Sequence, residues 1–146
     1  MQVCPVDHTE KAESALLVHV DFGQIRDANS ATEFVELAQS AGVHIGEMLT
    51  TRRVTPDPKL FIGSGKAFEV ANLCRLRGLE VVLFNHDLSP TQERNLEQVF
   101  GCRVVNRSRL ILDIFAQRAR SFEGKLQVEL AQLRHCLLYT SDAADE

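Results

Sequence analysis

The residues best suited to chemistry in this chain lie in one basic, glycine-rich stretch, TTRRVTPDPKLFIGSGK at positions 50–66. Several cations precede a predicted helix start, where unpaired backbone amides and the helix dipole favour an anion. The pattern predicts contacts with phosphate groups of RNA or of a nucleotide, and the alternative is a solvated loop stiffened by two prolines. The candidate phosphate-binding residues are Arg52, Arg53, Lys59, Gly63, Gly65 and Lys66.

The GSGK motif in this stretch differs from a nucleotide-binding P-loop at two required positions. The pattern GxxxxGK[ST] needs glycine at position 60 and serine or threonine at 67, where this chain has Leu60 and Ala67. The sequence also contains no DxxG or NKxD motif. A Walker-type site is therefore not predicted, although an ATP-binding turn at Gly63–Lys66 stays open as an alternative.

Asn85, His86 and Asp87 follow a predicted buried strand, at the sheet edge where parallel α/β proteins bind ligands. A His-Asp pair can act as a general base, but no nucleophile accompanies it, so a structural role in the turn is favoured. The histidines lack ligand spacing, and the four cysteines form no CxxC pair and are expected to pack as small apolar residues. We predict no catalytic residue and no metal site.

Four apolar runs alternate with four helical patterns, and this order predicts an α/β fold with a mostly parallel four-stranded sheet flanked by helices. The first and third runs are the most continuously apolar, which is typical of central strands, so we predict the strand order 2-1-3-4. The second run alternates, as an edge strand does. The expected strands are 15–20, 43–49, 79–84 and 102–105, and the expected helices start at Ser30, Ser64, Ser89 and Ser108.

Capping signals delimit these helices. Two pairs of residues have the spacing of capping boxes, Ser30 with Glu33 and Ser89 with Gln92. Pro90, directly after Ser89, takes the first helical position. The helix ends are predicted at three glycines. In the second helix the inward residues are expected to be Phe68, Ala71, Cys74 and Leu76, and the third helix carries the secondary site candidates Arg94 and Asn95.

Beyond residue 120 the apolar pattern narrows to a stripe. Phe122, Leu126, Leu130 and Leu133 recur at spacings of three and four, as in one arm of a helical hairpin or coiled coil. Arg118 and Arg120 are interpreted as a charged helix junction. A stripe this narrow requires a partner helix.

Three blocks of the sequence resemble the HflX family of translational GTPases: PDPKLFIGSGKAFEV at 56–70, VVLFNHDLSPTQERNLE at 81–97 and LILDIFAQRARSFEGKLQVELAQLRH at 110–135. The resemblance implies an N-terminal α/β domain that leads into a helical hairpin and a Ras-like G domain. It further implies binding to the large ribosomal subunit and its RNA, and ribosome splitting or rescue under stress. Some members are reported to bind or hydrolyse ATP through this region.

The resemblance also implies what this chain lacks. The G-domain motifs are absent from the sequence, so GTP and Mg²⁺ are expected for that missing domain, and no cofactor and no GTPase activity are expected for the chain alone. A scaffold that only positions the G domain is the plainest alternative.

The final eleven residues, CLLYTSDAADE at 136–146, have a different character. They begin with a run typical of a strand, no helix stop precedes them, and one reading frame of a widely used transposon sequencing adapter encodes CLLYTSDAAD. We expect a translated adapter. The expected organisation is a loose arm at 1–14, the α/β domain at 15–120, a truncated linker helix at 121–135 and this tail.

The composition is that of an ordinary water-soluble chain, with 45% hydrophobic and 25% charged residues and a net charge of −4. No apolar run is long enough for a membrane span, and the N-terminus does not have the pattern of a signal peptide. We expect a cytoplasmic monomer whose affinity for RNA depends on local clusters of cations.

Overall fold

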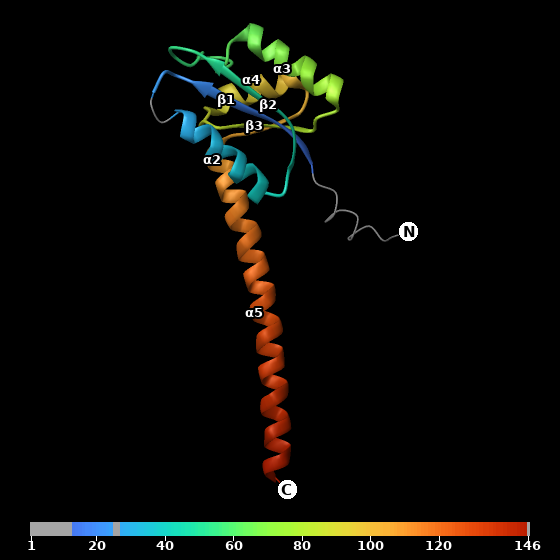
Figure 1. The fold of residues 1–146 in the computed structure, drawn as a ribbon. Coiled ribbons are helices and arrows are strands. Elements are labelled where there is room, and N and C mark those ends of the chain that lie inside the picture. The colour runs from blue at the N-terminus through green and yellow to red at the C-terminus, as the bar shows by residue number, and fades with distance from the viewer. Residues whose placement is uncertain (1–12, 25–26, 146) are drawn as a thin grey trace. The chain divides into compact units, whose positions relative to one another are not determined.

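The computed structural model describes residues 13–24 and 27–145, which form an α/β sheet unit followed by a long helix (Figure 1). The predicted loose arm at 1–14 lies almost entirely outside the described residues. Strands and helices alternate along the chain in the order β1 Ser14–Asp21, α2 Asp27–Ser40, β2 His44–Arg52, α3 Ser64–Arg77, β3 Val81–Phe84, α4 Pro90–Phe100, β4 Arg103–Val105 and α5 Arg107–Asp145.

The four strands form one parallel sheet in the order β2-β1-β3-β4, as predicted. Strand β1 is central, with Ala15 opposite Ile45 of β2 on one side and opposite Val81 of β3 on the other. Six consecutive residues of β1 are buried, because helices cover both faces of the sheet. The fold class and the edge position of β2 are confirmed.

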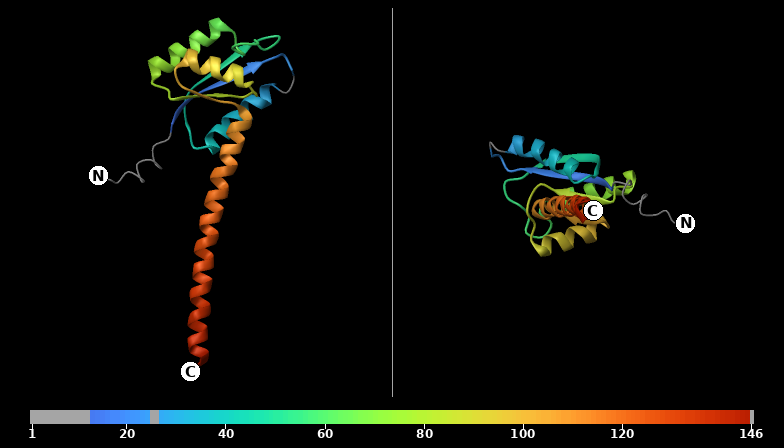
Figure 2. Two further views of the ribbon diagram at one scale, coloured as in Figure 1. Left: turned by 180° about the vertical axis from the view of Figure 1, so that it is seen from behind. Right: turned by 90° about the horizontal axis from the view of Figure 1, so that it is seen from below.

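Helices α3 and α4 cover one face of the sheet and α2 the opposite face (Figure 2). On the α3/α4 face, Leu16, Val18 and Val20 of β1 join a single apolar cluster with inward residues of both helices. On the other face, Leu17 lies on the side of α2, which buries Phe34 completely. This alternation follows from the two-residue period of a strand.

The capping box of α4 is confirmed. The Ser89 hydroxyl accepts from the Gln92 amide at 3.1 Å, the Gln92 side chain accepts from the Ser89 amide at 3.0 Å, and Pro90 is the first helical residue. Glycines in the left-handed region close α3 and α4 at Gly78 and Gly101, where an L side chain would be strained.

The other three predicted caps are wrong. Helix α2 begins before Ser30, whose hydroxyl accepts from the buried Asn85 amide instead. Helix α3 has Gly63 at its N-cap position, with no side-chain cap, and Ser64 is already helical. In α5 the cap is Asn106, whose side-chain oxygen accepts from the Arg109 amide at 2.8 Å, one residue before the helix starts.

The predicted inward face of α3 is half wrong. Phe68 and Leu76 are 61% and 83% exposed. The buried residues follow the helical spacing of three and four, but the stripe is displaced from the one predicted and consists of Ala67, Val70, Ala71 and Cys74.

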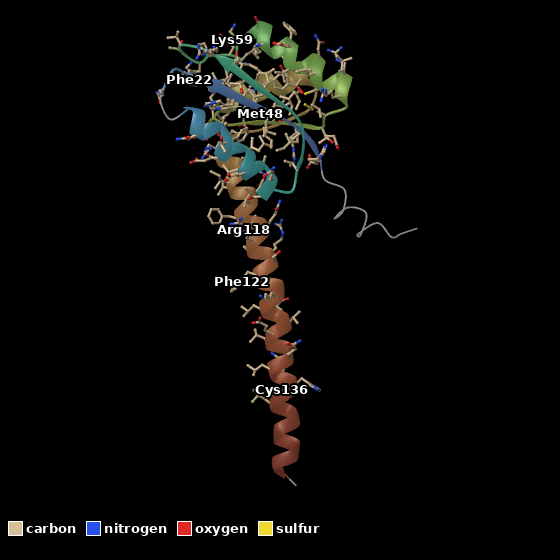
Figure 3. The ribbon with its side chains drawn as sticks, in the orientation of Figure 1. Phe22, Met48, Lys59, Arg118, Phe122 and Cys136 are labelled. Carbon is tan, nitrogen blue, oxygen red and sulfur yellow. The ribbon has the colours of Figure 1, made fainter. Side chains whose placement is uncertain are left out.

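Helix α5 is continuous from Arg107 to Asp145, so the strand-like character predicted for 136–141 is wrong. The chain divides into two compact units, of which the first ends at Leu112 and the second begins at Asp113. In the second unit the apolar residues from Phe122 to Leu137 are exposed, and Figure 3 labels Phe122 and Cys136 along this helix. The domain boundary proposed at residue 120 stays a prediction.

Among the described residues, no helix combines the length and the apolar character that crossing a membrane requires.

Candidate phosphate-contacting loop

The connection between β2 and α3 is a folded loop rather than an open one. Asp57 and Phe61 exchange two backbone hydrogen bonds of 2.9 Å. The Asp57 carboxylate also accepts from the backbone amides of Lys59 at 3.1 Å and Leu60 at 2.7 Å. Phe61 adopts a φ of 60° and is 5% exposed. Burial of this ring in the core offsets the strain that a non-glycine residue has in this region.

Two side chains of α4 hold this loop in place. Gln92 donates from Nε2 to the carbonyl of Asp57 at 2.8 Å, and Asn95 donates from Nδ2 to the carbonyl of Lys59 at 3.1 Å. Gln92 therefore serves both the helix cap and the loop. Asn95, a secondary site candidate, supports the loop from α4, while Arg94 next to it is exposed.

Arg53 is a brace within the loop. Its Nε donates to the carbonyl of Thr55 at 3.0 Å, and its Nη1 donates to the carbonyl of Ile62 at 3.3 Å. Gly63 leaves the space for this guanidinium, because a Cβ built there would lie 2.7 Å from Nη1. The structure therefore brings Arg53 and Gly63 together, in a contact that joins the two ends of the loop.

The other candidate cations differ in their availability. The Arg52 side chain is 88% exposed and its Nε lies 3.4 Å from the Asp21 carboxylate. Lys59 is exposed at the turn of the loop, as labelled in Figure 3. Lys66 is 31% exposed and its Nζ lies 2.8 Å from the Glu69 carboxylate. Gly65 is exposed in the first turn of α3, and a Cβ at this position would have no neighbour within 4 Å.

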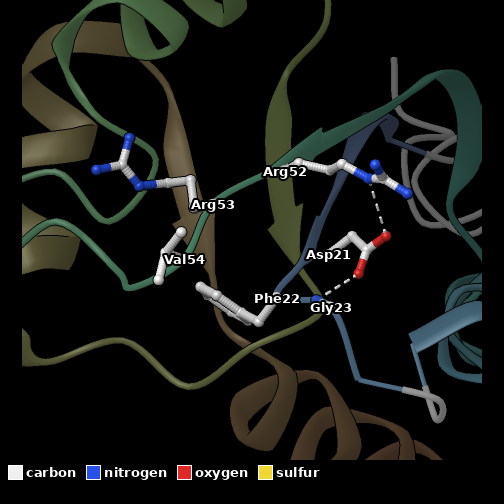
Figure 4. Close-up of a pocket in the computed structure, with 6 residues that line it drawn as sticks. All are labelled: Asp21, Phe22, Gly23, Arg52, Arg53 and Val54. Carbon is white, nitrogen blue, oxygen red and sulfur yellow. Dashed lines mark hydrogen bonds and ion pairs between the residues drawn. The ribbon is translucent and has the colours of Figure 1, made fainter.

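A pocket of about 410 Å³ lies beside the loop, at the carboxyl ends of β1 and β2 (Figure 4). Asp21 orders one wall, because its carboxylate accepts from the Gly23 amide at 2.8 Å and pairs with Arg52. Arg52 and Arg53 leave the strand end in different directions in this view. The lining residues are Asp21, Phe22, Gly23, Arg52, Arg53 and Val54.

The sequence did not single out four of the six pocket residues, which are Asp21, Phe22, Gly23 and Val54. The Phe22 ring meets Phe61 edge-on with centroids 6.1 Å apart and meets His86 edge-on at 5.5 Å. Val54 is 92% exposed. The available signal was position, because all four residues lie at the ends of β1 and β2 or within two residues of them, and the ends of these neighbouring strands meet at one sheet edge.

Asn85 lies at the centre of a buried polar network. Its Nδ2 donates to the Ser30 hydroxyl at 2.9 Å and lies 3.0 Å from Nδ1 of His19, while its Oδ1 accepts from Arg107. Asn85 and His19 are each 3% exposed. The network connects β1, β3, α2 and the first turn of α5, which satisfies polar groups that burial would otherwise leave unpaired.

His86 and Asp87 also have structural partners. Nε2 of His86 accepts from the Val20 amide at 2.9 Å, so it completes the backbone hydrogen bonding at the end of β1. The Asp87 carboxylate accepts from the Ser108 hydroxyl at 2.6 Å. These contacts support a structural role for the Asn-His-Asp turn. Within the described part of the chain, no three His, Cys, Asp or Glu side chains form a group that could hold a metal ion.

The parallel order 2-1-3-4, the loop that enters α3 and the long C-terminal helix define an α/β domain that ends in a long helix. Residues 28–116 match the family model described as "GTP-binding GTPase N-terminal". The chain belongs to this family, and it is similar to the N-terminal part of proteins named GTPase HflX.

Two relatives show how far the similarity extends. The chain is 55% identical over 129 residues to GTPase HflX of Escherichia coli K12, covering 88% of this chain and 30% of that protein. It is 39% identical over 134 residues to GTPase HflX of Caldanaerobacter subterraneus subsp. tengcongensis, covering 92% and 31%. The chain thus spans about a third of the length of these relatives.

The fold is shared with a solved structure, the crystal structure of the SsGBP and GDP complex. The TM-score is 0.59 at 24% identity, covering 85% of this chain and 35% of that one. At this identity the similarity shows the fold alone.

Proposed function

We propose that this chain is the ribosome-facing N-terminal domain of an HflX-type GTPase, and that the loop at 52–66 contacts RNA of the large ribosomal subunit. The G domain of the whole protein would bind GTP with Mg²⁺ and act in ribosome splitting or rescue. The observation that carries the proposal is the order of the loop, which is fixed at both ends and still presents Arg52 and Lys59 to solvent.

Order in the loop matters because a pre-arranged contact loses less conformational entropy on binding. The first 135 residues carry a net charge of only −1, so attraction to RNA must come from local cations rather than from the whole surface. Arg52 and Lys59 are the more exposed candidates, although Arg52 pairs with Asp21 at 3.4 Å, while Arg53 and Gly63 hold the loop and the less exposed Lys66 pairs with Glu69. Arg94 is exposed on the supporting helix.

The pocket beside the loop extends the proposed surface. Single-stranded RNA is often recognised by stacking an unpaired base on an aromatic ring or against a guanidinium group. Phe22 and Arg52 line the pocket together with exposed Val54, which supports a role for it in holding one unstacked base next to the phosphate contacts.

The test is binding of the 146-residue chain to isolated large ribosomal subunits at two salt concentrations. Replacing Arg52 and Lys59 by alanine, singly and together, should weaken binding, and each removed phosphate contact should reduce the salt slope by roughly one unit. The matched control is Arg75→Ala, because Arg75 is an exposed cation of α3 that hydrogen-bonds only locally, to Asn72 at 3.2 Å.

The double variant must keep the unfolding temperature of the parent for the comparison to count. Unchanged affinity and an unchanged salt slope in a folded double variant would refute the role of the loop. Equal losses in the double variant and in Arg75→Ala would point to general charge rather than to this surface. Arg94→Ala would then be the next variant to measure.

A nucleotide-binding role is the second candidate, and the uncapped start of α3 favours it. Gly63 supplies no side-chain hydrogen bond to the first turn, and such a turn is suited to a phosphate. Titration of the same chain with ATP, and of Lys66→Ala, separates the two candidates. Saturable ATP binding that is lost in Lys66→Ala would support this second function. If the chain binds neither ATP nor large ribosomal subunits, the remaining function is that of a scaffold that only positions the G domain.

A further inference from the structure

The exposed arginine at the start of the loop has an acidic partner on the neighbouring strand. Arg52 and Asp21 are the last residues of β2 and β1, and they lie directly opposite each other in the register of this parallel pair. Nε of Arg52 lies 3.4 Å from the Asp21 carboxylate (Figure 4). Both residues line the pocket beside the loop, so a nucleotide bound there would reach the ion pair.

Asp21 is held in position by contacts that do not involve the Arg52 side chain. Its backbone carbonyl accepts from the Arg53 amide at 3.1 Å, which extends the pairing of β1 with β2 by one residue. The carboxylate oxygen that does not face Arg52 accepts from the Gly23 amide at 2.8 Å. The Asp21 side chain is 26% exposed, whereas the Arg52 side chain is 88% exposed. Asp21 is therefore the fixed member of the pair, and Arg52 is the member that can move.

The ion pair is weak enough to exchange for another anion. Hydrogen bonds between a guanidinium and a carboxylate are about 2.7–2.9 Å long, so the separation of 3.4 Å is a looser electrostatic contact. Ion pairs in contact with solvent contribute little free energy, because water screens the charges and the ordered side chain loses entropy. A phosphate can accept two parallel hydrogen bonds from one guanidinium, so it can displace the carboxylate.

We infer that Asp21 is an internal competitor for the RNA phosphate, which holds Arg52 in the free chain and releases it when a phosphate of the large-subunit RNA binds. This inference rests on the proposed function, because it assigns a regulating residue to the same loop. Asp21 lowers the affinity for RNA in two ways: its pair with Arg52 must be broken, and its charge repels the incoming phosphate. Only the first of these effects depends on Arg52. Asp21 is thus a positioning residue that acts through Arg52.

The experiment is a double-mutant cycle of Asp21→Asn and Arg52→Ala, in which binding of the 146-residue chain to isolated large ribosomal subunits is measured. Asparagine removes the charge but keeps an oxygen that can accept from the Gly23 amide. Asp21→Asn should tighten binding about two- to fivefold, which is the range that corresponds to one exposed ion pair. In the Arg52→Ala background the same substitution should have a clearly smaller effect, because only the repulsion remains to be removed.

The matched control for charge is Glu36→Gln, which removes one exposed carboxylate from α2, on the sheet face opposite α3 and α4 (Figure 2). Equal tightening by Asp21→Asn with and without Arg52, or equal tightening by Glu36→Gln, would overturn the inference in favour of general charge. If Arg52→Ala weakens binding but Asp21→Asn does not tighten it, the inference fails and the proposed function stands. If Arg52→Ala binds as the parent does, the proposed contact of Arg52 with RNA fails, and the inference fails with it.

A second measurement tests the ion pair in the free chain. Phenylglyoxal modifies arginine side chains, and mass spectrometry of peptides gives the rate at each position. Arg52 should react faster in Asp21→Asn than in the parent, while Arg53, which braces the loop, should react slowly in both and so report that the loop is folded. Asp21→Ser is the second variant if asparagine impairs folding, since a serine hydroxyl can also accept from a nearby backbone amide. An Arg52 rate that neither substitution changes would mean that Asp21 does not hold Arg52 in solution, and this result would overturn the inference.

Discussion

Gly63 and Gly65 are two residues apart, yet the structure gives them opposite roles. Gly63 has φ 85° and ψ 159° at the start of α3, a combination that is essentially restricted to glycine. It also borders the Arg53 guanidinium. Gly65 is helical and its Cβ direction is open. A motif written GSG therefore contains one glycine that the backbone requires and one that it does not.

Gly63→Ala should destabilise the chain by about 1–3 kcal/mol, because alanine is strained in this conformation and displaces Arg53. Gly65→Ala is the matched control and should be neutral or stabilise by up to about 1 kcal/mol, since alanine restricts the unfolded chain. Urea unfolding of both variants measures the difference. Equal effects of the two substitutions would mean that the Arg53 brace contributes nothing to stability.

At the residue scale the sequence identified the loop but could not assign tasks within it. Arg52 and Arg53 are adjacent and chemically identical. Only the direction in which each side chain leaves the end of β2 makes Arg52 an exposed cation and Arg53 a brace of the loop. That direction depends on Ile62 and Gly63, which return to Arg53 across the loop. Tertiary contacts of this kind have no local signature.

Between elements, Asn85 contributes a connection that apolar packing cannot supply. It joins the ends of β1 and β3 to α2 and to the first turn of α5 through His19, Ser30 and Arg107. Of these three groups, His19 is buried, whereas Ser30 and Arg107 are partly exposed and Arg107 also pairs with Glu33 at 3.8 Å. His19 therefore depends most on the amide for a partner.

Asn85→Ala should destabilise the chain by about 2–4 kcal/mol, because it removes the hydrogen bonds of the amide to buried His19 and to partly buried Ser30 and Arg107. The control is Asn72→Ala, an exposed asparagine of α3 bonded only to Arg75, with an expected change within about 0.5 kcal/mol. Denaturant midpoints at an unchanged slope give the comparison. A loss below about 1 kcal/mol for Asn85→Ala would show that water replaces the amide.

The helices and strands were largely predictable from the sequence, but the residues at which the helices begin were mostly predicted wrongly. Strand apolarity predicted the sheet order, because only central strands need two apolar faces. Ser89 was predicted correctly as a cap because its partner Gln92 and Pro90 agree with it locally. Ser30 has the same spacing to Glu33, but the hydroxyl bonds to Asn85, 55 residues away, and no local pattern reveals that competition.

For the molecule as a whole, amide hydrogen exchange should separate the two units. Amides of β1 and β3 should exchange near the rate of global unfolding, because these strands are buried on both faces. Amides from Phe122 to Leu137 should be at least about 100-fold less protected, since their apolar side chains are exposed and a helix without packing opens locally. Mass spectrometry of peptides from a dilute sample measures both regions.

The control for this measurement is dilution, because self-association of the exposed stripe would protect α5 in concentrated samples. Protection of α5 equal to that of β1 at the lowest measurable concentration would contradict the expectation. It would mean that the second unit is stabilised by more than its own helical hydrogen bonds.

The central place of β1 has a consequence for synthesis of the protein. Ala15 must pair with Val81, which is translated 66 positions later. At about 5–20 residues per second, roughly 3–13 s pass between the two. During that interval the central strand β1, with six consecutive residues that are buried in the folded chain, has no neighbour on one side, so it offers a binding site to chaperones at the tunnel exit. Slower codons before residue 81 should lengthen that exposure, and faster ones should shorten it.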